Sequence, residues 1–261
     1  MPYAGRMSSQ KTPRHIGIVT GASRGLGLAI ARQLLDRGWR LLTLSRKPER
    51  SLARGDAEAL EQWAIDLARP VEAAARLQDW VAALRADDLA SLTLINNAAG
   101  LAPPAPLRHS DAAQTSLALR VGLEAPLLLS AAFLRASRGL PVPRRILNIS
   151  SGLGRSAMAG AAAYCATKAG MDHFSRAVAL EEAGEPNGAR IVSLAPGVID
   201  TDMQLQLRSA DPVAFAEHAR FAALKSEGRL DSAETAARKV LAWLDRSDFG
   251  HDPVADVRDA A

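Results

Sequence analysis

The sequence has a single cysteine, few aromatic residues and no uninterrupted apolar run of membrane-spanning length. Cys165 cannot form an internal disulfide, which fits a reducing compartment, so we expect a cytoplasmic protein. No apolar run approaches the roughly 18 residues that a membrane helix requires, so no membrane partner is expected. Residues 1–14 contain no hydrophobic segment, and we interpret them as a tail outside the fold, not a signal peptide.

Charge of both signs is nearly balanced. Lys and Arg number 32 against 28 Asp and Glu, which gives a net charge of +4. The basic residues form no run and do not alternate with aromatic residues, as a single-strand nucleic-acid groove requires, so no nucleic-acid partner is expected. A nucleic-acid-binding domain remains an alternative on the basic isoelectric point alone, and it predicts steeply salt-dependent DNA binding. The mildly positive field favours an anionic cofactor, and no metal site is predicted.

Strand-like and helix-like patterns alternate along the chain. The predicted strands cover residues 15–20, 40–45, 58–66, 92–96, 146–149, 190–194 and 254–257. The predicted helices include residues 71–84, 112–136 with a kink or restart at Pro126, 161–183 and 233–244. This alternation predicts one α/β domain over residues 15–261, with a doubly wound, mostly parallel sheet and helices on both faces.

A glycine-rich turn joins the first predicted strand to the first predicted helix. Gly21, Gly25 and Gly27 have the spacing G-x-x-x-G-x-G. Glycines in this context let the backbone turn tightly and approach a pyrophosphate, which the helix N-terminus stabilises. The order of strand, turn and helix therefore predicts a Rossmann-type dinucleotide site, and a glycine turn without a ligand is the alternative.

Basic residues follow the second predicted strand, where an acidic residue would bind a ribose 2′-hydroxyl. Arg46 stands at its carboxyl end, and no Asp or Glu lies between Arg37 and Pro48. Together with Arg24 in the glycine turn, Arg46 predicts NADP(H) as the cofactor, because arginine suits a 2′-phosphate. A solvated surface arginine is the alternative for either residue alone.

Two aspartates stand next to predicted helices. Asp66 closes the third predicted strand and either meets an adenine amino group or caps the helix that starts near Val71. Asp231 is expected to cap the helix over 233–244, with Glu234 at capping-box spacing. Residues 205–228, which follow the sixth strand, are expected to form a lid of short helices.

Tyr164 and Lys168 lie four residues apart in a predicted helix, which stacks their side chains on one face. A lysine charge about 4 Å away would lower the pKa of a tyrosine from about 10 toward 7, a shift of about 4 kcal/mol. Ser151 follows the fifth strand, where its hydroxyl enters the same cleft. The three residues predict proton transfer to a substrate oxygen, although a Tyr and a Lys at this spacing also occur by chance.

Together these motifs resemble those of the short-chain dehydrogenase/reductase family. The matching motifs, in order, are residues 20–27 (TGASRGLG), Asp66, residues 96–100 (NNAAG), Ser151, Tyr164-x-x-x-Lys168 and residues 196–201 (PGVIDT). The resemblance implies hydride transfer between a nicotinamide and a carbonyl carbon. It makes Ser151 the residue that binds the carbonyl oxygen, Tyr164 the proton donor, and Lys168 the residue that holds the nicotinamide ribose and lowers the tyrosine pKa.

The resemblance also implies the binding residues. The cofactor set is Gly21, Ser23, Arg24, Gly25, Leu26, Gly27, Arg46, Asp66, Asn97, Ala98, Tyr164, Lys168, Pro196, Gly197, Ile199 and Thr201. Asn97 and Ala98 would support a ribose, while Ile199 and Thr201 would hold the carboxamide. The substrate set is Ser151, Leu153, Tyr164, Gly197, Met203 and Asp256.

Within this family the chain is most similar to the sepiapterin reductase and bacterial benzil reductase branch. The stretches that indicate the branch include residues 163–168 (AYCATK), 195–203 (APGVIDTDM) and 254–259 (VADVRD). The aspartate that anchors a pterin in sepiapterin reductases falls on Asp256, but Pro253 and Arg258 depart from the branch pattern. Gly122 occupies the position of an asparagine that usually holds a water for the proton relay, so we expect backbone and water to complete the relay here.

The leading hypothesis from the sequence is an NADPH-dependent oxidoreductase that reduces a ketone or diketone, favouring a hydrophobic or aromatic one. A dinucleotide-binding regulatory protein without turnover is the alternative. The small-residue face of the 161–183 helix is expected to pack against a second copy in a homodimer or homotetramer.

Overall fold

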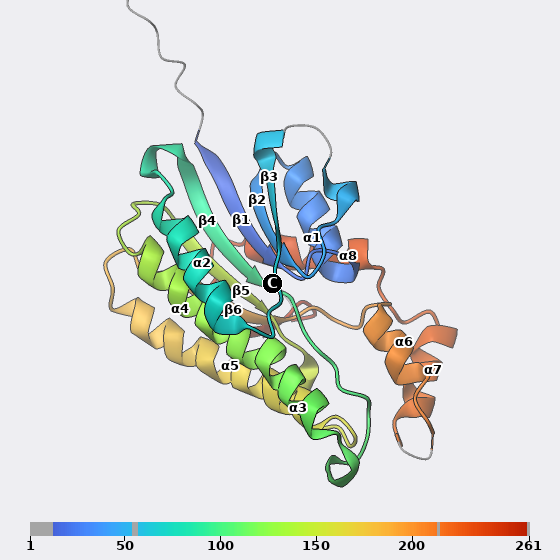
Figure 1. Cartoon of the computed structure of the whole chain (residues 1–261). Coiled ribbons are helices and arrows are strands. Elements are labelled where there is room, and N and C mark those ends of the chain that lie inside the picture. The colour runs from blue at the N-terminus through green and yellow to red at the C-terminus, as the bar shows by residue number, and fades with distance from the viewer. Residues whose placement is uncertain (1–12, 54–56, 213–214, 260–261) are drawn as a thin grey trace, which may run out of the picture.

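The computed structural model describes residues 13–53, 57–212 and 215–259. Within them, seven strands form one parallel sheet in the order β3-β2-β1-β4-β5-β6-β7 (Figure 1). The strands are β1 (Arg14–Thr20), β2 (Arg40–Ser45), β3 (Leu60–Ala64), β4 (Leu89–Asn96), β5 (Arg144–Ile149), β6 (Arg190–Ala195) and β7 (Val254–Asp256). All seven predicted strands are present, and the predicted doubly wound α/β fold is confirmed.

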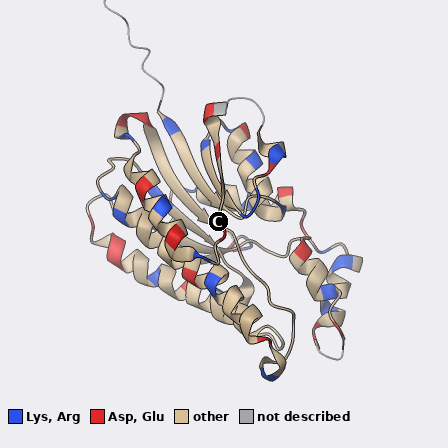
Figure 2. Cartoon of the chain, in the orientation of Figure 1, with Lys and Arg blue, Asp and Glu red and all other residues tan. Residues whose placement is uncertain are grey.

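Helices cover both faces of the sheet. The helices of the described residues are α1 (Gly25–Asp36), α2 (Pro70–Ala82), α3 (Ala112–Leu119), α4 (Ala125–Ser137), α5 (Ala162–Ala183), α6 (Asp202–Arg208), α7 (His218–Ser226) and α8 (Ala233–Leu244). Helices α1 and α8 cover one face, while α2, α4 and α5 cover the other (Figure 1). Lys and Arg are interspersed with Asp and Glu along the helices (Figure 2).

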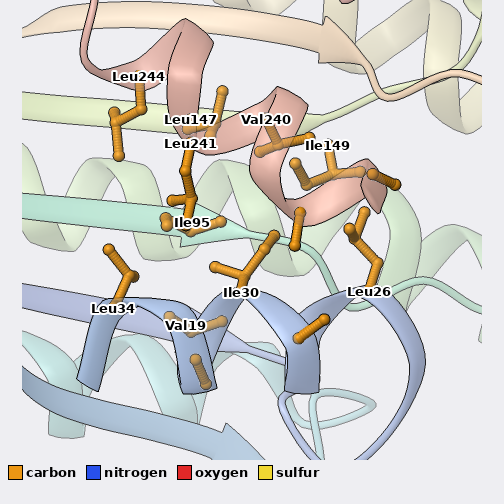
Figure 3. Packing of buried hydrophobic residues seen from close by; sticks show 14 of the residues in the cluster. Val19, Leu26, Ile30, Leu34, Ile95, Leu147, Ile149, Val240, Leu241 and Leu244 are labelled. Atoms are coloured by element: carbon orange, nitrogen blue, oxygen red, sulfur yellow. The ribbon is translucent and has the colours of Figure 1, made fainter. Parts of the chain in front are cut away.

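Apolar side chains of helices and strands interlock between the layers. On one face, Ile30 of α1 and Leu241 of α8 pack over Leu147 of β5 in a single cluster of buried side chains (Figure 3). On the other, Leu77 of α2 and Phe133 of α4 belong to a second cluster, and both are fully buried. Burial at about 25 cal/mol per Å² of apolar surface makes these two layers the main source of stability.

The predicted helix over 112–136 is two helices joined by a π-helical turn (Arg120–Glu124), and α4 restarts one residue before Pro126. The continuous stretch from Ala112 to Ser137 is long and apolar enough to cross a membrane, with a mean hydropathy of 1.7 over 18 of its residues, so the expectation that no such stretch exists needs correction. Buried side chains of α4 such as Leu129 pack in the core. Core helices of other proteins have the same length and apolar composition, so the stretch is weak evidence for a membrane span.

One predicted helix cap and one alternative cap are wrong. Ser232, not Asp231, caps α8, because its hydroxyl accepts a hydrogen bond from the Thr235 amide. Asp231 instead pairs with Lys239 at 2.6 Å and bridges to Ile199. Helix α2 begins after Arg69 with no side-chain cap, so the alternative that Asp66 caps it fails. Strand β1 begins at Arg14, and residues 1–12 of the expected tail lie outside the described residues.

The strand order places the carboxyl ends of all seven strands at one edge. Sequential strands run outward in both directions from β1, because β2 lies on one side of it and β4 on the other. In open parallel sheets, ligands bind in the crevice where the order reverses. The motifs after β1, β4, β5 and β6 meet at this edge, and α6 and α7 project beyond it (Figure 1).

Candidate active site

Ser151 lies just beyond the carboxyl end of β5. Its hydroxyl accepts a hydrogen bond from the Leu153 amide at 3.2 Å and caps the short 3₁₀ turn Gly152–Gly154. Because the amide fills an acceptor position, the hydroxyl proton is available to a partner oxygen. The Ser151 hydroxyl lies close enough to the Tyr164 phenol to lower its pKa. Two of the predicted catalytic side chains are therefore in contact.

Lys168 lies one turn after Tyr164 in α5, as the spacing predicts. Its ammonium is 5.6 Å from the centroid of the Tyr164 ring. It donates a hydrogen bond of 2.7 Å to the carbonyl oxygen of Ile149, the last residue of β5. Since Lys168 is 2% exposed, this backbone oxygen replaces part of the water that the ammonium loses.

The pKa values differ from the prediction. Burial raises the pKa of Tyr164 to about 12, whereas its hydrogen bond with Ser151 lowers it. Burial lowers the pKa of Lys168 to about 8, and the charge of Asp172 opposes that effect. The expected pKa near 7 for Tyr164 is thus wrong, because burial of the phenol is the largest effect on its pKa. At neutral pH Tyr164 holds its proton, which is the state that a proton donor needs.

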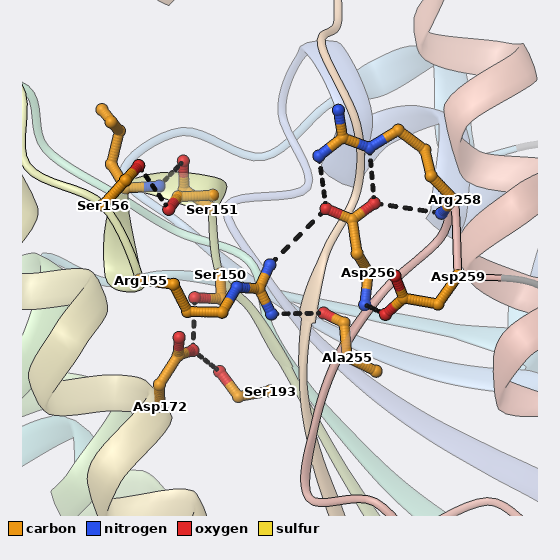
Figure 4. A network of polar contacts seen from close by, with 12 residues as sticks. Ser150, Ser151, Arg155, Ser156, Asp172, Ser193, Ala255, Asp256, Arg258 and Asp259 are labelled. Carbon is orange, nitrogen blue, oxygen red and sulfur yellow. Dashed lines mark hydrogen bonds and ion pairs between the residues drawn. The ribbon is translucent and has the colours of Figure 1, made fainter.

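A buried aspartate, which the sequence reading missed, lies one turn beyond Lys168. Asp172 Oδ1 accepts hydrogen bonds of 2.6 Å from Ser150 and 2.7 Å from Ser193 (Figure 4). An aspartate inside a helix pattern resembles a surface residue, and only the fold brings the ends of β5 and β6 to it. Its spacing of four residues from Lys168 was the one available signal.

The glycine turn is fixed by contacts that exclude side chains. Gly21 and Gly25 have φ values of 69° and 55°, which favour glycine. A Cβ at Gly27 would collide with the Gly21 carbonyl and the Asn97 amide. Asn97 Nδ2 donates to the Thr20 carbonyl at 3.0 Å and to the Gly21 carbonyl at 3.2 Å. The Asn97 side chain thus holds the glycine turn against the end of β4.

The backbone after β4 is tied to β1 in the same way. Thr20 Oγ1 accepts hydrogen bonds from the amides of Asn97 at 2.9 Å and Ala98 at 3.0 Å. Helix α1 begins at Gly25 and has no capping side chain at its N-terminus, where the first backbone amides of a helix lack intrahelical partners. Ser23 and Leu26 flank this start, and Leu26 is buried in the core.

The residues expected to recognise the adenosine end of a dinucleotide are exposed. Arg46 lies one residue past β2. Arg24 pairs with Asp202 at 2.7 Å, with both side chains about 70% exposed (70% and 68%). Asp66 is exposed beyond β3, and its carboxylate accepts a hydrogen bond from the Ala68 amide at 3.0 Å. The pairing of Arg24 with Asp202 was not predicted, because these residues are far apart in the sequence.

The segment after β6 carries the remaining predicted residues. Pro196 follows β6 directly, and Gly197 has a φ of 83° that suits glycine. Ile199 is 8% exposed in the core, whereas Thr201 stands at the start of α6 and its Cγ2 would lie 3.7 Å from a Cβ at Gly25. The segment therefore closes back over the glycine turn. Leu153 and Met203 are partly buried on the turn after Ser151 and on α6.

Asp256 is engaged by two arginines. Its carboxylate receives two side-chain hydrogen bonds from Arg258, at 2.7 Å and 2.6 Å, and one of 3.5 Å from Arg155 (Figure 4). The hydrogen bonds from Arg258 hold the pKa of Asp256 below its usual range. Arg155 also donates to the Ala255 carbonyl at 3.1 Å, so it links the turn after Ser151 to β7. Asp256 is thus a paired carboxylate, a feature that the sequence did not reveal.

Gly122 is buried in the π-helical turn and faces α5. A Cβ at this position would lie 3.1 Å from Thr167 Cγ2 and 3.2 Å from Thr167 Cβ. Thr167 therefore fills the space that a side chain at position 122 would need. The structure explains the glycine by packing against the helix that carries Tyr164 and Lys168.

Comparison with known proteins gives a consistent result. A profile of the short chain dehydrogenase family matches residues 15–212. The chain is 35% identical over 239 residues to the benzil reductase ((S)-benzoin forming) of Bacillus cereus. That alignment covers 89% of this chain and 94% of the reductase. The chain is 33% identical over 249 residues to the sepiapterin reductase of Mus musculus, covering 89% and 92%.

A solved structure extends the similarity to three dimensions. A short-chain dehydrogenase/reductase from Burkholderia vietnamiensis is 34% identical to this chain, with a TM-score of 0.65. The match covers 95% of this chain and 99% of that one.

Proposed function

Because the chain belongs to the short-chain dehydrogenase family, we propose that it is an NADPH-dependent carbonyl reductase that reduces a ketone or diketone to an alcohol. The observation that carries the proposal is the convergence of Ser151, Tyr164 and Lys168 at the carboxyl edge of the sheet. Benzil reductases and sepiapterin reductases are among its relatives, as the branch motifs predict.

The protein's own residues would bind the carbonyl and supply the proton. The Ser151 hydroxyl donates to the carbonyl oxygen and orients it toward Tyr164. The Tyr164 phenol then transfers its proton to that oxygen as the carbonyl carbon is reduced. The nearby ammonium of Lys168 favours the tyrosinate that remains. When bound, NADPH supplies the hydride.

The glycine turn fits a dinucleotide. Among the described residues, a Cβ at Gly25 would meet only Thr201, at 3.7 Å, so the backbone there borders open space that a phosphate can approach. The uncapped amides of α1 would hold the pyrophosphate. Arg46 and Arg24 would hold the 2′-phosphate, which supports NADPH over NADH. Asp66 would meet the adenine, Ala98 a ribose, and Pro196, Ile199 and Thr201 the carboxamide.

An uncharged diketone is the substrate class that we favour. The residues proposed to line the pocket include Leu153, Gly197 and Met203, which are apolar or small. The carboxylate of Asp256 already bonds to Arg258, so it offers a poor anchor for the amino group of a pterin. The similarity to a benzil reductase supports the same class.

The test is a panel of carbonyl compounds monitored by oxidation of NADPH and of NADH, with benzil and sepiapterin included. We expect benzil to be reduced with NADPH, at least tenfold more efficiently than with NADH, and sepiapterin to be a poor substrate. Equal efficiency with NADH would refute the argument from the arginines. Tight NADPH binding without turnover on any carbonyl would favour the regulatory alternative.

We also propose that the chain forms a homodimer or homotetramer in the cytoplasm. Apolar side chains are exposed along α3 and α4, where Leu117 and Leu127 are 42% and 43% exposed. Leu119, Leu123 and Leu127 line one hollow on this surface, which adjoins α5. Sedimentation at micromolar concentration tests the assembly, and a monomer would contradict it.

A further inference from the structure

We propose that Asp172 is a positioning residue of the active site, whose buried carboxylate supplies the counter-charge that keeps Lys168 protonated. The inference rests on the proposed function, because it assigns a task to a group next to the proposed catalytic lysine. Asp172 does not reach the substrate in this account. It acts through Lys168 and through the end of β5 that carries Ser151.

Tyr164, Lys168 and Asp172 occupy successive turns of α5. The spacing of four and eight residues places the three side chains along one side of the helix. Asp172 is 1% exposed and Lys168 is 2% exposed, so both ionisable groups are buried. A buried charge is costly unless an opposite charge or hydrogen bonds compensate it.

The carboxylate is only half satisfied by hydrogen bonds. Oδ1 accepts from Ser150 at 2.6 Å and from Ser193 at 2.7 Å (Figure 4). Among the described residues, the buried Oδ2 has no hydrogen-bond partner. A Cβ added at Gly154 would lie 2.5 Å from Oδ2, so the glycine turn after Ser151 is packed directly against it. Ser150, Ser193 and the glycine turn after Ser151 therefore enclose the Asp172 carboxylate, one helical turn from Lys168.

Lys168 is the buried cation whose pKa the charge of Asp172 affects. Burial lowers its pKa to about 8, and the charge of Asp172 is the effect that raises it. Loss of that charge would lower the pKa of Lys168 further, and a neutral amine cannot stabilise a tyrosinate.

Other titratable groups that face this part of α5 come from the helix itself and from the elements packed against it. On its own helix these are Tyr164 and Cys165. The packed elements contribute Arg155 and Asp256, which pair with each other. They also contribute Arg120 and Glu124 of the π-helical turn, which are both exposed. Arg138 pairs with Glu185 at the far end of the helix.

Asp172→Asn removes the charge of the side chain and keeps its shape. Asparagine keeps an oxygen that can accept from both serine hydroxyls, but it carries no charge. We expect the pKa of Lys168 to fall by about one unit. Lysine protonation is lost as pH rises, so the alkaline limb of kcat/KM should move to lower pH by the same amount. Ser193→Ala is the matched control, since it removes one hydrogen bond and retains the charge.

The titration of Lys168 is read directly by NMR of lysine-labelled protein, assigned with Lys168→Arg. This readout does not need turnover, so failure of the proposed reductase activity is distinguishable from failure of the inference. An unchanged Lys168 midpoint in Asp172→Asn would overturn the proposal, as would an equal shift in Ser193→Ala. If Asp172→Asn does not fold, the carboxyl ¹³C shift of Asp172 in the wild-type protein decides, and a protonated Asp172 at pH 7 would refute the inference.

Discussion

Arg24 of the glycine turn and Asp202 at the start of α6 form an ion pair of 2.7 Å across the crevice at the carboxyl edge of the sheet. The pair joins the proposed 2′-phosphate site to the helix that the sequence predicted as part of a lid. Both side chains are largely exposed, so the pair contributes at most about 1 kcal/mol. A phosphate of higher charge can therefore compete for Arg24.

Asp202→Asn frees Arg24 from this competition. We expect the variant to bind NADPH about two- to fivefold more tightly, with no change for NADH, because the 2′-phosphate alone distinguishes them. Fluorescence titration with each nucleotide measures the effect. Asp248→Asn, at an exposed ion pair distant in the sequence, is the control. An equal change for both nucleotides would show that Arg24 does not recognise the 2′-phosphate.

The reductase activity should fall as pH rises above about 8. The pKa of Lys168 is lowered to about 8, so its ammonium is present below that pH and lost above it. The pKa of Tyr164 is raised to about 12, so the phenol keeps its proton throughout. A kcat/KM profile from pH 6 to 10 tests this, with thermal melting at each pH to separate unfolding. Activity that rises steadily to pH 10 is the contrary result.

Arg258 should stabilise the fold through Asp256 in a pH-dependent way. The Arg258 hydrogen bonds lower the pKa of Asp256, so their contribution is present above the ordinary carboxyl pKa and is lost as pH falls through the folded-state value. We expect Arg258→Gln to lower the free energy of unfolding by about 1 kcal/mol at pH 7 and by less in acid.

Urea unfolding of Arg258→Gln at pH 7 and at pH 3 measures that difference. Arg229→Gln breaks a pair with Glu227 in which both side chains are over half exposed, so it should have little effect at either pH. An equal loss of unfolding free energy in both variants would mean that the burial of Asp256 adds nothing to the stability that its ion pair contributes.

Gly122 should tolerate a side chain only if Thr167 becomes smaller. Gly122→Ala places a methyl group about 3.1 Å from Thr167 Cγ2, and such overpacking costs about 1–3 kcal/mol. Thr167→Ser removes Cγ2 and keeps the hydroxyl that donates to the Tyr164 carbonyl. We therefore expect Gly122→Ala to lower the melting temperature in the wild type and to cost less in the Thr167→Ser background. Equal costs in both backgrounds would contradict the packing explanation.

The strands could be predicted because their signal is local. Runs such as residues 15–20 and 92–96 are apolar, and a buried parallel strand requires that composition. The exact helix caps depend on contacts that cross the fold. Asp231 and Ser232 are both good caps, and only the bridge of Asp231 to Ile199 shows why the serine takes that position.

The proposed catalytic residues carry a sequence signature, but their electrostatics do not. The spacing of Tyr164 and Lys168 places them on one helix face, as predicted. Their pKa values depend on burial, on Ser151 and on Asp172, none of which a spacing reveals. The pairing of Asp256 with Arg258 likewise became visible only in the folded chain.

Replacement of Tyr164 by phenylalanine tests the central claim most directly. The variant keeps the ring beside Lys168 and removes only the hydroxyl, whose pKa Ser151 lowers in the wild-type protein. With NADPH binding and the melting temperature checked as controls, we expect the rate of benzil reduction to fall by about 10²- to 10⁴-fold. A Tyr164→Phe variant that reduces the carbonyl at the wild-type rate would contradict the assignment of Tyr164 as the proton donor.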